Sequence, residues 1–451
     1  MNGGRKISRA TMPMIAALAI ALCAALTLAP AARAQESQPV IEDWSLHAQS
    51  TAIYQGDFGF HSPYQGPNSL SGNQQWRETI SVTGFLGRRL PWDGGALYFD
   101  PEFNQGFGVS RSLGIASFPN GEAVKAGFDT PKPNVARLFL RQTFGQGGGQ
   151  GGGQEYLKPD QNQLGENVDI DRFTVTAGKF SASDIFDDNA YAHDPRTQFL
   201  NLSFIDALAW DYPADSKGYT DGAAFELIRE AWAFRWGLFL EPKIANERDL
   251  DPRFWIHLGL VAQLDERYTL FGRGGVMREL VFLNRADMGN LEQAAANGGN
   301  IVATRRDRYK AGFALNLEQG LTDDLGFFSR VSWNDGRSEP WAFTDIDRGV
   351  SLGLSLQGTS WGRAGDTVGL AGAINGVSKA HANYLAAGGT GIFIGDGRLD
   401  YAPEGVIETY YAIALAEPAT LTFDYQFVVN PAFNQDRGPV SLFGARLHVE
   451  Y

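Results

Sequence analysis

The chain has 451 residues, of which 12% are aromatic and 54 are glycine, and its formal net charge is −13. An acidic chain has the wrong sign for gripping phosphates, which excludes a nucleic-acid partner. Beyond the N-terminal segment described next, no apolar run is long enough to cross a bilayer as a helix, so a helical membrane protein is also excluded.

The N-terminus has the pattern of a secretory signal peptide. A basic start precedes an apolar run over residues 14–28, and a small-x-small cleavage site ends at Ala34. The run is too short to span a bilayer comfortably. We therefore predict a cleaved signal peptide at 1–34 and, exported across the inner membrane, a mature domain at 35–451.

The mature chain would be more acidic and free of cysteine. Cys23, the only cysteine, lies in the predicted signal peptide, so disulfides contribute nothing to the mature fold. The signal peptide carries four basic and no acidic residues, so its removal changes the net charge from −13 to −17.

Alternating apolar and polar side chains begin early in the mature chain. Trp44, Leu46 and Tyr54 share one side, while Ser45 and His47 lie on the other. Side chains of a strand alternate between its two faces, so this pattern predicts a strand with one apolar face. Similar alternation recurs over residues 232–241, 309–318, 351–357, 421–430 and 440–451. A soluble sandwich can show part of this, but large aromatics kept so persistently on one face favour a barrel in lipid.

The segment 136–144 places basic residues on the polar face of a strand. Leu138 and Leu140 share the apolar face, so Arg137 and Arg141 are predicted to point into the barrel. A run of glycine and glutamine follows over residues 145–154. It lacks the Gly-Lys-Ser/Thr and the helix of a phosphate cradle, so we interpret it as a flexible external loop.

The lengths of the connections alternate in the C-terminal half. Long connections are predicted at 278–305, 334–348 and 375–404, and short ones at 263–267, 319–324 and 417–419. Outer-membrane barrels have short periplasmic turns and long external loops. The sequence therefore predicts an all-β, transmembrane antiparallel barrel of about 16 strands, or 18, with long external loops and a periplasmic C-terminus in the outer membrane of a Gram-negative cell.

The last twelve residues support this interpretation most directly. Phe443, Leu447 and the terminal Tyr451 lie on one face, and Arg446 and His448 on the other. The apolar face would contact outer-membrane lipid. A final strand that ends on an aromatic resembles the signal through which the barrel assembly machinery recognises outer-membrane proteins.

Several inward-facing residues are candidates for contact with a solute. Guanidinium groups donate paired hydrogen bonds to hydroxyls and carboxylates, and an aromatic ring can offer its face to a sugar. Alternatively, the arginines pair with acidic neighbours and only fill the wall. The candidates are Arg137, Phe139, Arg141, Arg235, Arg330, Asp424, Gln426, Arg446 and Glu450.

Little in the sequence indicates catalysis or a metal centre. The six histidines are scattered without the spacing of zinc ligands, and no nucleophile-elbow motif is present. A barrel enzyme or a surface adhesin stays open as the alternative from another class.

Six stretches resemble the carbohydrate-selective porin family, OprB type. They are Ser62–Leu70 (SPYQGPNSL), Phe118–Ala123 (FPNGEA), Ala136–Phe144 (ARLFLRQTF), Tyr191–Asn201 (YAHDPRTQFLN), Trp210–Tyr219 (WDYPADSKGY) and Asp424–Val440 (DYQFVVNPAFNQDRGPV). The resemblance implies a sixteen-stranded barrel that passes monosaccharides down their gradient, with arginines and acidic residues at its constriction. It departs at the glycine–glutamine run.

Together these observations predict a passive outer-membrane channel for small hydrophilic solutes, with small carbohydrates as partners and no cofactor. Weak binding in the lumen speeds passage only if the solute can also leave. A general, non-selective porin is the alternative within transport.

Overall fold

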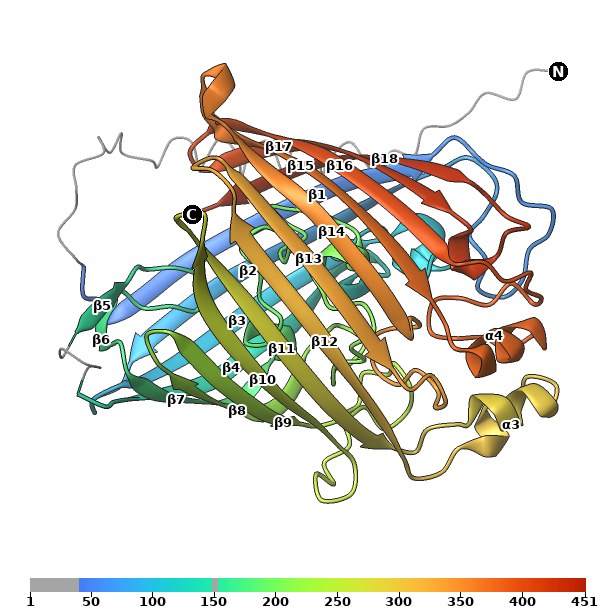
Figure 1. Cartoon of the computed structure of the whole chain (residues 1–451), viewed down its shortest axis with the longest axis horizontal. Helices are drawn as coiled ribbons and strands as arrows, with labels where there is room; N and C mark the ends of the chain where they lie inside the picture. Colours follow the sequence, from blue (N-terminus) through green and yellow to red (C-terminus); the bar gives the residue numbers. More distant parts are fainter. Residues whose placement is uncertain (1–39, 148–152) are drawn as a thin grey trace. The chain divides into compact units, whose positions relative to one another are not determined.

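A computed structural model describes residues 40–147 and 153–451, and the predicted signal peptide lies outside the described residues. Residues 41–451 form one compact unit built around a closed antiparallel barrel (Figure 1). Sixteen strands form the barrel, which confirms the smaller predicted number. They are β1 (Trp44–Asp57), β2 (Gln75–Arg89), β3 (Gly95–Gly106), β4 (Phe128–Gly145), β7 (Arg172–Phe180), β8 (Thr220–Ile228), β9 (Trp232–Phe239), β10 (Leu258–Leu270), β11 (Arg273–Ala286), β12 (Arg308–Gly320), β13 (Leu325–Asn334), β14 (Arg348–Gly358), β15 (Arg363–Gly376), β16 (Glu404–Ala416), β17 (Ala419–Val429) and β18 (Val440–Glu450).

The remaining elements are short and lie in connections. β5 (Gln154–Leu157) and β6 (Glu166–Asp169) form a separate two-stranded sheet. The helices are η1 (Val109–Ser112), η2 (Ala123–Lys125), η3 (Ala182–Asp184), α2 (Leu202–Ile205), α3 (Leu291–Ala296), η4 (Val302–Thr304), η5 (Thr359–Trp361), α4 (Lys379–Ala386) and η6 (Pro431–Phe433). None of the described helices has the length and apolar character needed to cross a membrane.

Pairing of the first strand with the last closes the barrel. In the β1–β18 pair, Ala52 lies opposite Leu447. The pairing continues to the end of the chain, because the Ala48 N–H donates to the Tyr451 carbonyl at 2.7 Å and the Tyr451 N–H donates to the Ala48 carbonyl at 2.9 Å. The terminal residue is therefore part of the hydrogen-bonded seam.

The two faces of the strands divide as the alternation predicts. Leu138, on the outer face of β4, is 48% exposed, and the Trp44 ring on β1 is 65% exposed. The polar residues that alternate with the apolar ones along the strands point inward. Gln49, Thr51 and Arg446 are examples, and all three are buried. Apolar side chains thus cover the surface that faces lipid, and polar side chains line the interior.

Two predicted boundaries at the β10–β11 hairpin are wrong. Residues 263–267 were expected to form a turn and Arg278 to start a long loop, but both lie inside strands, and the turn is at 271–272. Asp265 and Arg278 are strand residues that point into the barrel and are buried there. A polar lumen accepts charged side chains within a strand, so charged residues at these positions do not mark a turn.

The glycine–glutamine run lies at the opposite end of the barrel from the one predicted. It belongs to the connection between β4 and β7, at the same end as the short β16–β17 turn and the C-terminus, which is the end predicted to be periplasmic. Residues 148–152 lie outside the described residues, but residues 153–171 fold back toward the lumen: Gln161 bonds Glu450, and Leu164 is fully buried. The general rule that periplasmic turns are short fails at this one connection.

The position of Tyr451 generates a prediction about assembly. Deleting Tyr451 should strongly reduce the amount of folded barrel, because the seam loses its last two backbone hydrogen bonds and its terminal aromatic. Tyr451→Phe should assemble normally. Heat-modifiable migration of outer-membrane fractions on gels measures this, and an undiminished folded band for the deletion would contradict the prediction.

The alternation of loops and turns generates a prediction about topology. A cysteine replacing Ala386, on the exposed side of α4, should react with a membrane-impermeant reagent in intact cells. A cysteine replacing Ser360, exposed in the β14–β15 turn, should react only after the outer membrane is permeabilised. Labelling of Ser360→Cys alone in intact cells would invert the barrel.

Candidate functional site

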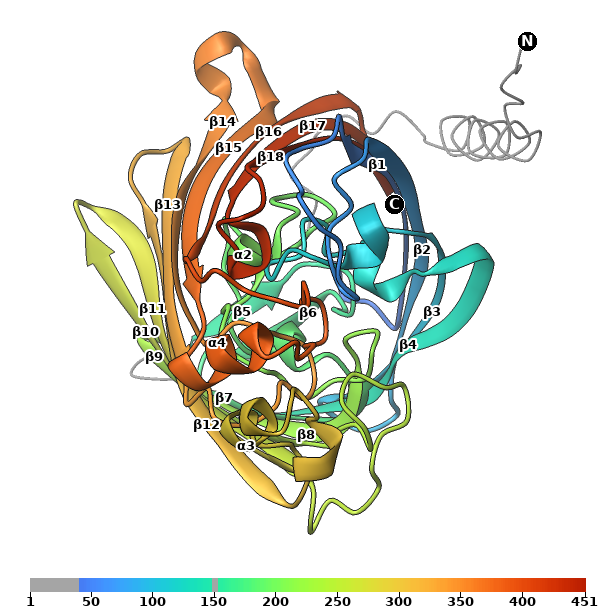
Figure 2. The same cartoon turned by 90° about the vertical axis from the view of Figure 1, so that its right-hand side faces the viewer.

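Two external connections fold into the barrel and narrow it: loop 107–127, between β3 and β4, and loop 181–219, between β7 and β8. Figure 2, which looks along the barrel, shows these segments and α2 inside the ring of strands. Every residue of α2 is buried. The lumen at this level is therefore shaped by the two loops as well as by the wall.

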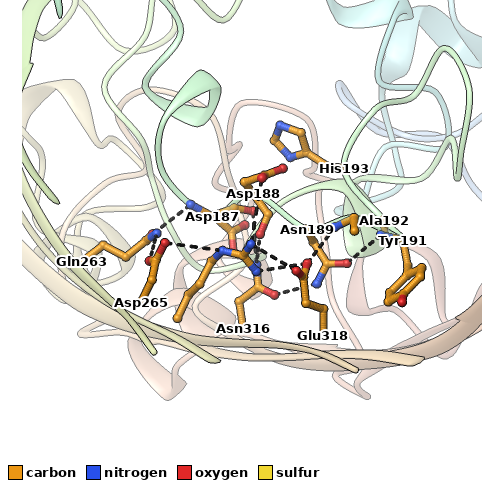
Figure 3. Close-up of polar contacts among 12 residues, drawn as sticks. Asp187, Asp188, Asn189, Tyr191, Ala192, His193, Gln263, Asp265, Asn316 and Glu318 are labelled. Atoms are coloured by element: carbon orange, nitrogen blue, oxygen red, sulfur yellow. Dashed lines mark hydrogen bonds and ion pairs between the residues drawn. The ribbon is translucent and has the colours of Figure 1, made fainter. Parts of the chain in front are cut away.

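Arg330 on β13 fastens the first part of loop 181–219 to the wall. Its guanidinium donates to the carbonyls of Phe204 at 2.7 Å and Ala192 at 2.8 Å, and to the Asp187 carboxylate at 3.1 Å. Asn316 on β12 also donates to Asp187, at 2.6 Å. The close-up shows Asn316 and the neighbouring wall residues Gln263, Asp265 and Glu318 facing this part of the loop (Figure 3). Asp187 has a positive φ of 61°, so these bonds fix a backbone conformation that few side chains adopt readily.

A carboxylate and a guanidinium fasten the middle of the same loop. Glu408 on β16 accepts the N–H groups of Leu200 at 2.6 Å and Asn201 at 3.0 Å. Arg446 on β18 donates to the carbonyls of Pro195 at 2.7 Å and Gln198 at 2.8 Å. Charged wall residues thus replace the water that the loop backbone would otherwise bind.

Loop 107–127 is held in the same way. Glu404 on β16 accepts the N–H groups of Ala116 and Ser117, both at 2.9 Å. Gln426 on β17 donates to the Pro119 carbonyl at 2.8 Å and accepts from the Asn201 side chain at 3.1 Å. Gln426 therefore ties the two loops together.

Several predicted solute contacts lie behind these loops. Arg330, Arg446 and Gln426 are completely buried, and Asp424 is nearly so. Phe139 is also buried: its ring stacks on Tyr98, with 5.0 Å between centroids. The alternation predicts the correct face for each of these residues, but it cannot reveal that a distant loop covers that face.

A central cavity of about 260 Å³ remains between the two loops and the wall. Its charged lining residues are Glu122, Lys125, Arg137, Asp184, Asp194, Arg196 and Asp206. Of these, only Arg137 was singled out from the sequence. Four carboxylates face three cations, so the cavity is mixed in charge.

Tyr219, at the end of loop 181–219, is at the centre of this network. Its hydroxyl donates to Glu102 at 3.1 Å. The Lys125 ammonium and the Arg137 guanidinium each lie 5.5 Å from its ring centroid. The ring thus keeps two like charges close together while offering its electron-rich face to them.

Ion pairs hold the three cations of the cavity and two of its carboxylates. Arg137 contacts Asp184 at 2.5 Å, and Arg196 and Lys125 each contact Glu122 at 3.3 Å. Burial raises the pKa of Glu122, but the charges of Arg196 and Lys125 outweigh it and hold this pKa well below its usual range. Likewise, Arg137 outweighs burial and lowers the pKa of Asp184. Both carboxylates are charged at neutral pH.

Asp206 differs from these carboxylates. Burial raises its pKa to about 6, although the nearby charges of His193, Arg330 and Lys125 act in the opposite direction. Asp187 adds to the increase. One carboxylate of the cavity therefore loses its charge within a mildly acidic range.

An exit cavity of about 280 Å³ lies on the periplasmic side, and Asp184 lines both it and the central cavity. Arg141 lines the exit cavity and donates to the Asn162 carbonyl at 2.9 Å. Arg235 also lines it and is paired with Glu226, at 2.8 Å, and with Asp265. Segment 153–171 supplies part of this lining and also places Gln161 in the central cavity.

Glu450, the last of the predicted candidates, lies near this segment. It accepts a hydrogen bond from Gln161 at 2.7 Å. No group of three or more His, Cys, Asp or Glu among the described residues could hold a metal ion.

The comparisons with known proteins agree with this geometry. The family model for the carbohydrate-selective porin, OprB family, matches residues 68–451. A structure of Pseudomonas putida OprB aligns with a TM-score of 0.68 and 13% identity, over 91% of this chain and 94% of that one. The outer membrane channel DcaP of Acinetobacter baumannii aligns with a TM-score of 0.51 and 10% identity, over 91% of this chain and 97% of that one. No curated protein matches the sequence.

These structural likenesses, at such low identity, establish the shared fold, and the family match covers most of the chain. The sixteen-stranded barrel with its inward loops is an outer-membrane channel, and the chain belongs to the carbohydrate-selective porin family, OprB type.

Proposed function

We propose that this porin passes small carbohydrates, monosaccharides above all, by passive diffusion, and that the central cavity selects them. The observation that carries the proposal is the network of paired charges at the narrowed lumen, within a family described as carbohydrate-selective. A paired cation and carboxylate together offer donors and acceptors, which suits a sugar hydroxyl because a hydroxyl both donates and accepts.

Exposure identifies the residues that would contact the sugar. The side chains of Asp184, Lys125 and Arg137 are 26%, 18% and 14% exposed, whereas that of Glu122 is 1% exposed. We assign direct contact to the first three. Tyr219 is buried behind them and would position the two cations without stacking on the sugar.

Weak binding fits passive transport. Each hydrogen bond in such a wet site contributes about 1 kcal/mol net, so a few bonds give affinities in the millimolar range. A solute held this weakly is concentrated at the constriction and still released. A general porin is the alternative within transport: it would conduct ions equally well, but sugars would not block its current.

Substitutions of Arg137 and Asp184 can distinguish the effect of net charge on ion preference from the effect of the side chains on sugar binding. Arg137→Ala should weaken the block of ion current by glucose in planar bilayers. It should also shift ion preference toward cations, because Asp184 is left unpaired. Adding Asp184→Asn should restore the ion preference, since the net charge is again that of the wild type, but not the sugar block.

Lys243→Ala is the matched control, because this exposed external lysine lies outside the central cavity and its loss removes the same charge. It should change neither property. Folding of each variant is checked by heat-modifiable migration. A double variant that keeps the wild-type sugar block would show that the pair only fills the wall.

Asp206 generates a prediction about pH. Its pKa of about 6 means that the carboxylate is charged above this pH and neutral below it. Lowering the pH from about 7.5 to about 5 removes one negative charge from the cavity, so the reversal potential in a salt gradient should shift toward anion permeation. Asp206→Asn should reduce this shift. Asp249→Asn, in the exposed part of loop 240–257, should retain it, and an equal shift in both variants would contradict the assignment.

A further inference from the structure

A third cavity, the entry cavity, lies among the external loops and has a volume of about 370 Å³. Its lining comes from loop 107–127, the external end of β4, the end of loop 181–219 and two further external loops. Lys217 lines the entry cavity and the adjacent Gly218 lines the central cavity. A solute that approaches from outside would meet the entry cavity first.

The charged residues of this cavity all have the same sign. They are Arg111, Lys217 and Arg248, and no Asp or Glu is among its lining residues. The central and exit cavities, by contrast, each contain several carboxylates. The lining is basic although the chain as a whole has 51 acidic residues and only 38 basic ones.

None of the three cations forms an ion pair with a described residue. Arg248 donates to the neutral Asn134 side chain at 3.4 Å. Arg111 lies 5.5 Å from the Phe107 ring centroid, and the Lys217 ammonium lies 5.4 Å from that of Phe128. Aromatic faces and one amide are weak substitutes for a carboxylate. Glu102 and Asp215, whose charges act on Lys217, lie outside the lining, so the lining itself carries only positive charge.

Lys217 is the most constrained of the three. It is 4% exposed, and its ammonium has no hydrogen-bond acceptor among the described residues. Burial lowers its pKa, and so does the nearby charge of Arg248, although Glu102 and Asp215 act in the opposite direction. A buried donor without an acceptor costs free energy. The negative charge of an anion bound in the cavity would attract the ammonium and offset part of that cost.

We propose that the entry cavity binds the carboxylate or phosphate of a small water-soluble anion, so that the pore collects acidic sugars or sugar phosphates at its external mouth. That the bound anion is a sugar rests on the function proposed above; the anion site itself does not. Arg248 is exposed in its loop and would supply the planar donor pair, while the buried Lys217 would contribute charge.

Equilibrium binding to the purified barrel in detergent tests the site without relying on transport. Isothermal titration with sodium glucuronate, inorganic phosphate and glucose should show that the two anions bind more tightly than glucose. The difference in affinity between the anions and glucose should decrease as salt is added. Arg248→Gln should weaken glucuronate binding about tenfold, as loss of one charge-assisted hydrogen bond implies. Lys217→Met should weaken it in the same direction.

Lys243→Gln is the control for Arg248→Gln, since it lies in the same loop but outside the entry cavity. It should bind glucuronate as the wild type does. Equal affinity of the wild type for glucuronate and glucose would overturn the proposal, as would unchanged binding in Arg248→Gln. Because Arg248 is exposed, its variant should fold even if Lys217→Met does not.

Two further measurements distinguish failure of the proposed sugar function from failure of the proposed anion site. Block of the current by glucose should be unchanged in Arg248→Gln. If glucose fails to block even the wild type while glucuronate still binds, the sugar function fails and the anion site stands. Glucuronate block is also compared in bilayers with and without lipopolysaccharide: equal block supports a soluble anion, and block abolished by the lipid would assign the site to a lipid phosphate and overturn the proposal.

Discussion

Every backbone N–H and C=O of a strand in hydrocarbon has to find a partner within the protein, and the whole structure depends on that constraint. Sixteen strands satisfy it only as a closed ring, so the seam between β1 and β18 is as important as any other pair. The backbone bonds between Tyr451 and Ala48 extend the seam to the last residue. Once the ring is closed, the outer face has to be apolar, and charged residues are accommodated inside it or at its ends.

The interior uses those charges to hold backbone. Arg330, Arg446, Glu404 and Glu408 would each be costly to bury alone, but each meets several carbonyl or N–H groups of an inward loop. The same bonds give hydrogen-bond partners to the N–H and C=O groups of the loop backbone. These groups lie outside the strand ladders and have little access to water. Wall charges and inward loops therefore depend on each other, and neither is stable in this position without its partner.

The residues left facing the lumen differ in kind from these anchors. Arg137, Lys125 and Asp184 are paired but partly exposed, so a solute can exchange hydrogen bonds with them without opening the structure. In the entry cavity the three cations form no ion pair with any residue that the structure describes, and the lining contains no carboxylate. If a solute follows the path proposed above, it would meet the basic lining of the entry cavity first and the ion pairs of the central cavity next. Such an arrangement would attract an anion before it discriminates between solutes.

The sequence alone predicted the barrel and, for the strands in which it shows alternation, which side chains point inward, because alternation along a strand is a local property that lipid enforces. It did not determine which inward residues meet the solute. Arg330 and Arg137 both lie on the polar, inward face of their strands. Arg330 is nevertheless covered by loop 181–219, whereas Arg137 lines the central cavity. Nor did it place segment 153–171, since the glycine–glutamine run carries no sign of the barrel end to which it belongs. Which inward residues are left uncovered, and where segment 153–171 lies, depend on contacts between residues far apart in the chain. Only the closed barrel brings these residues together.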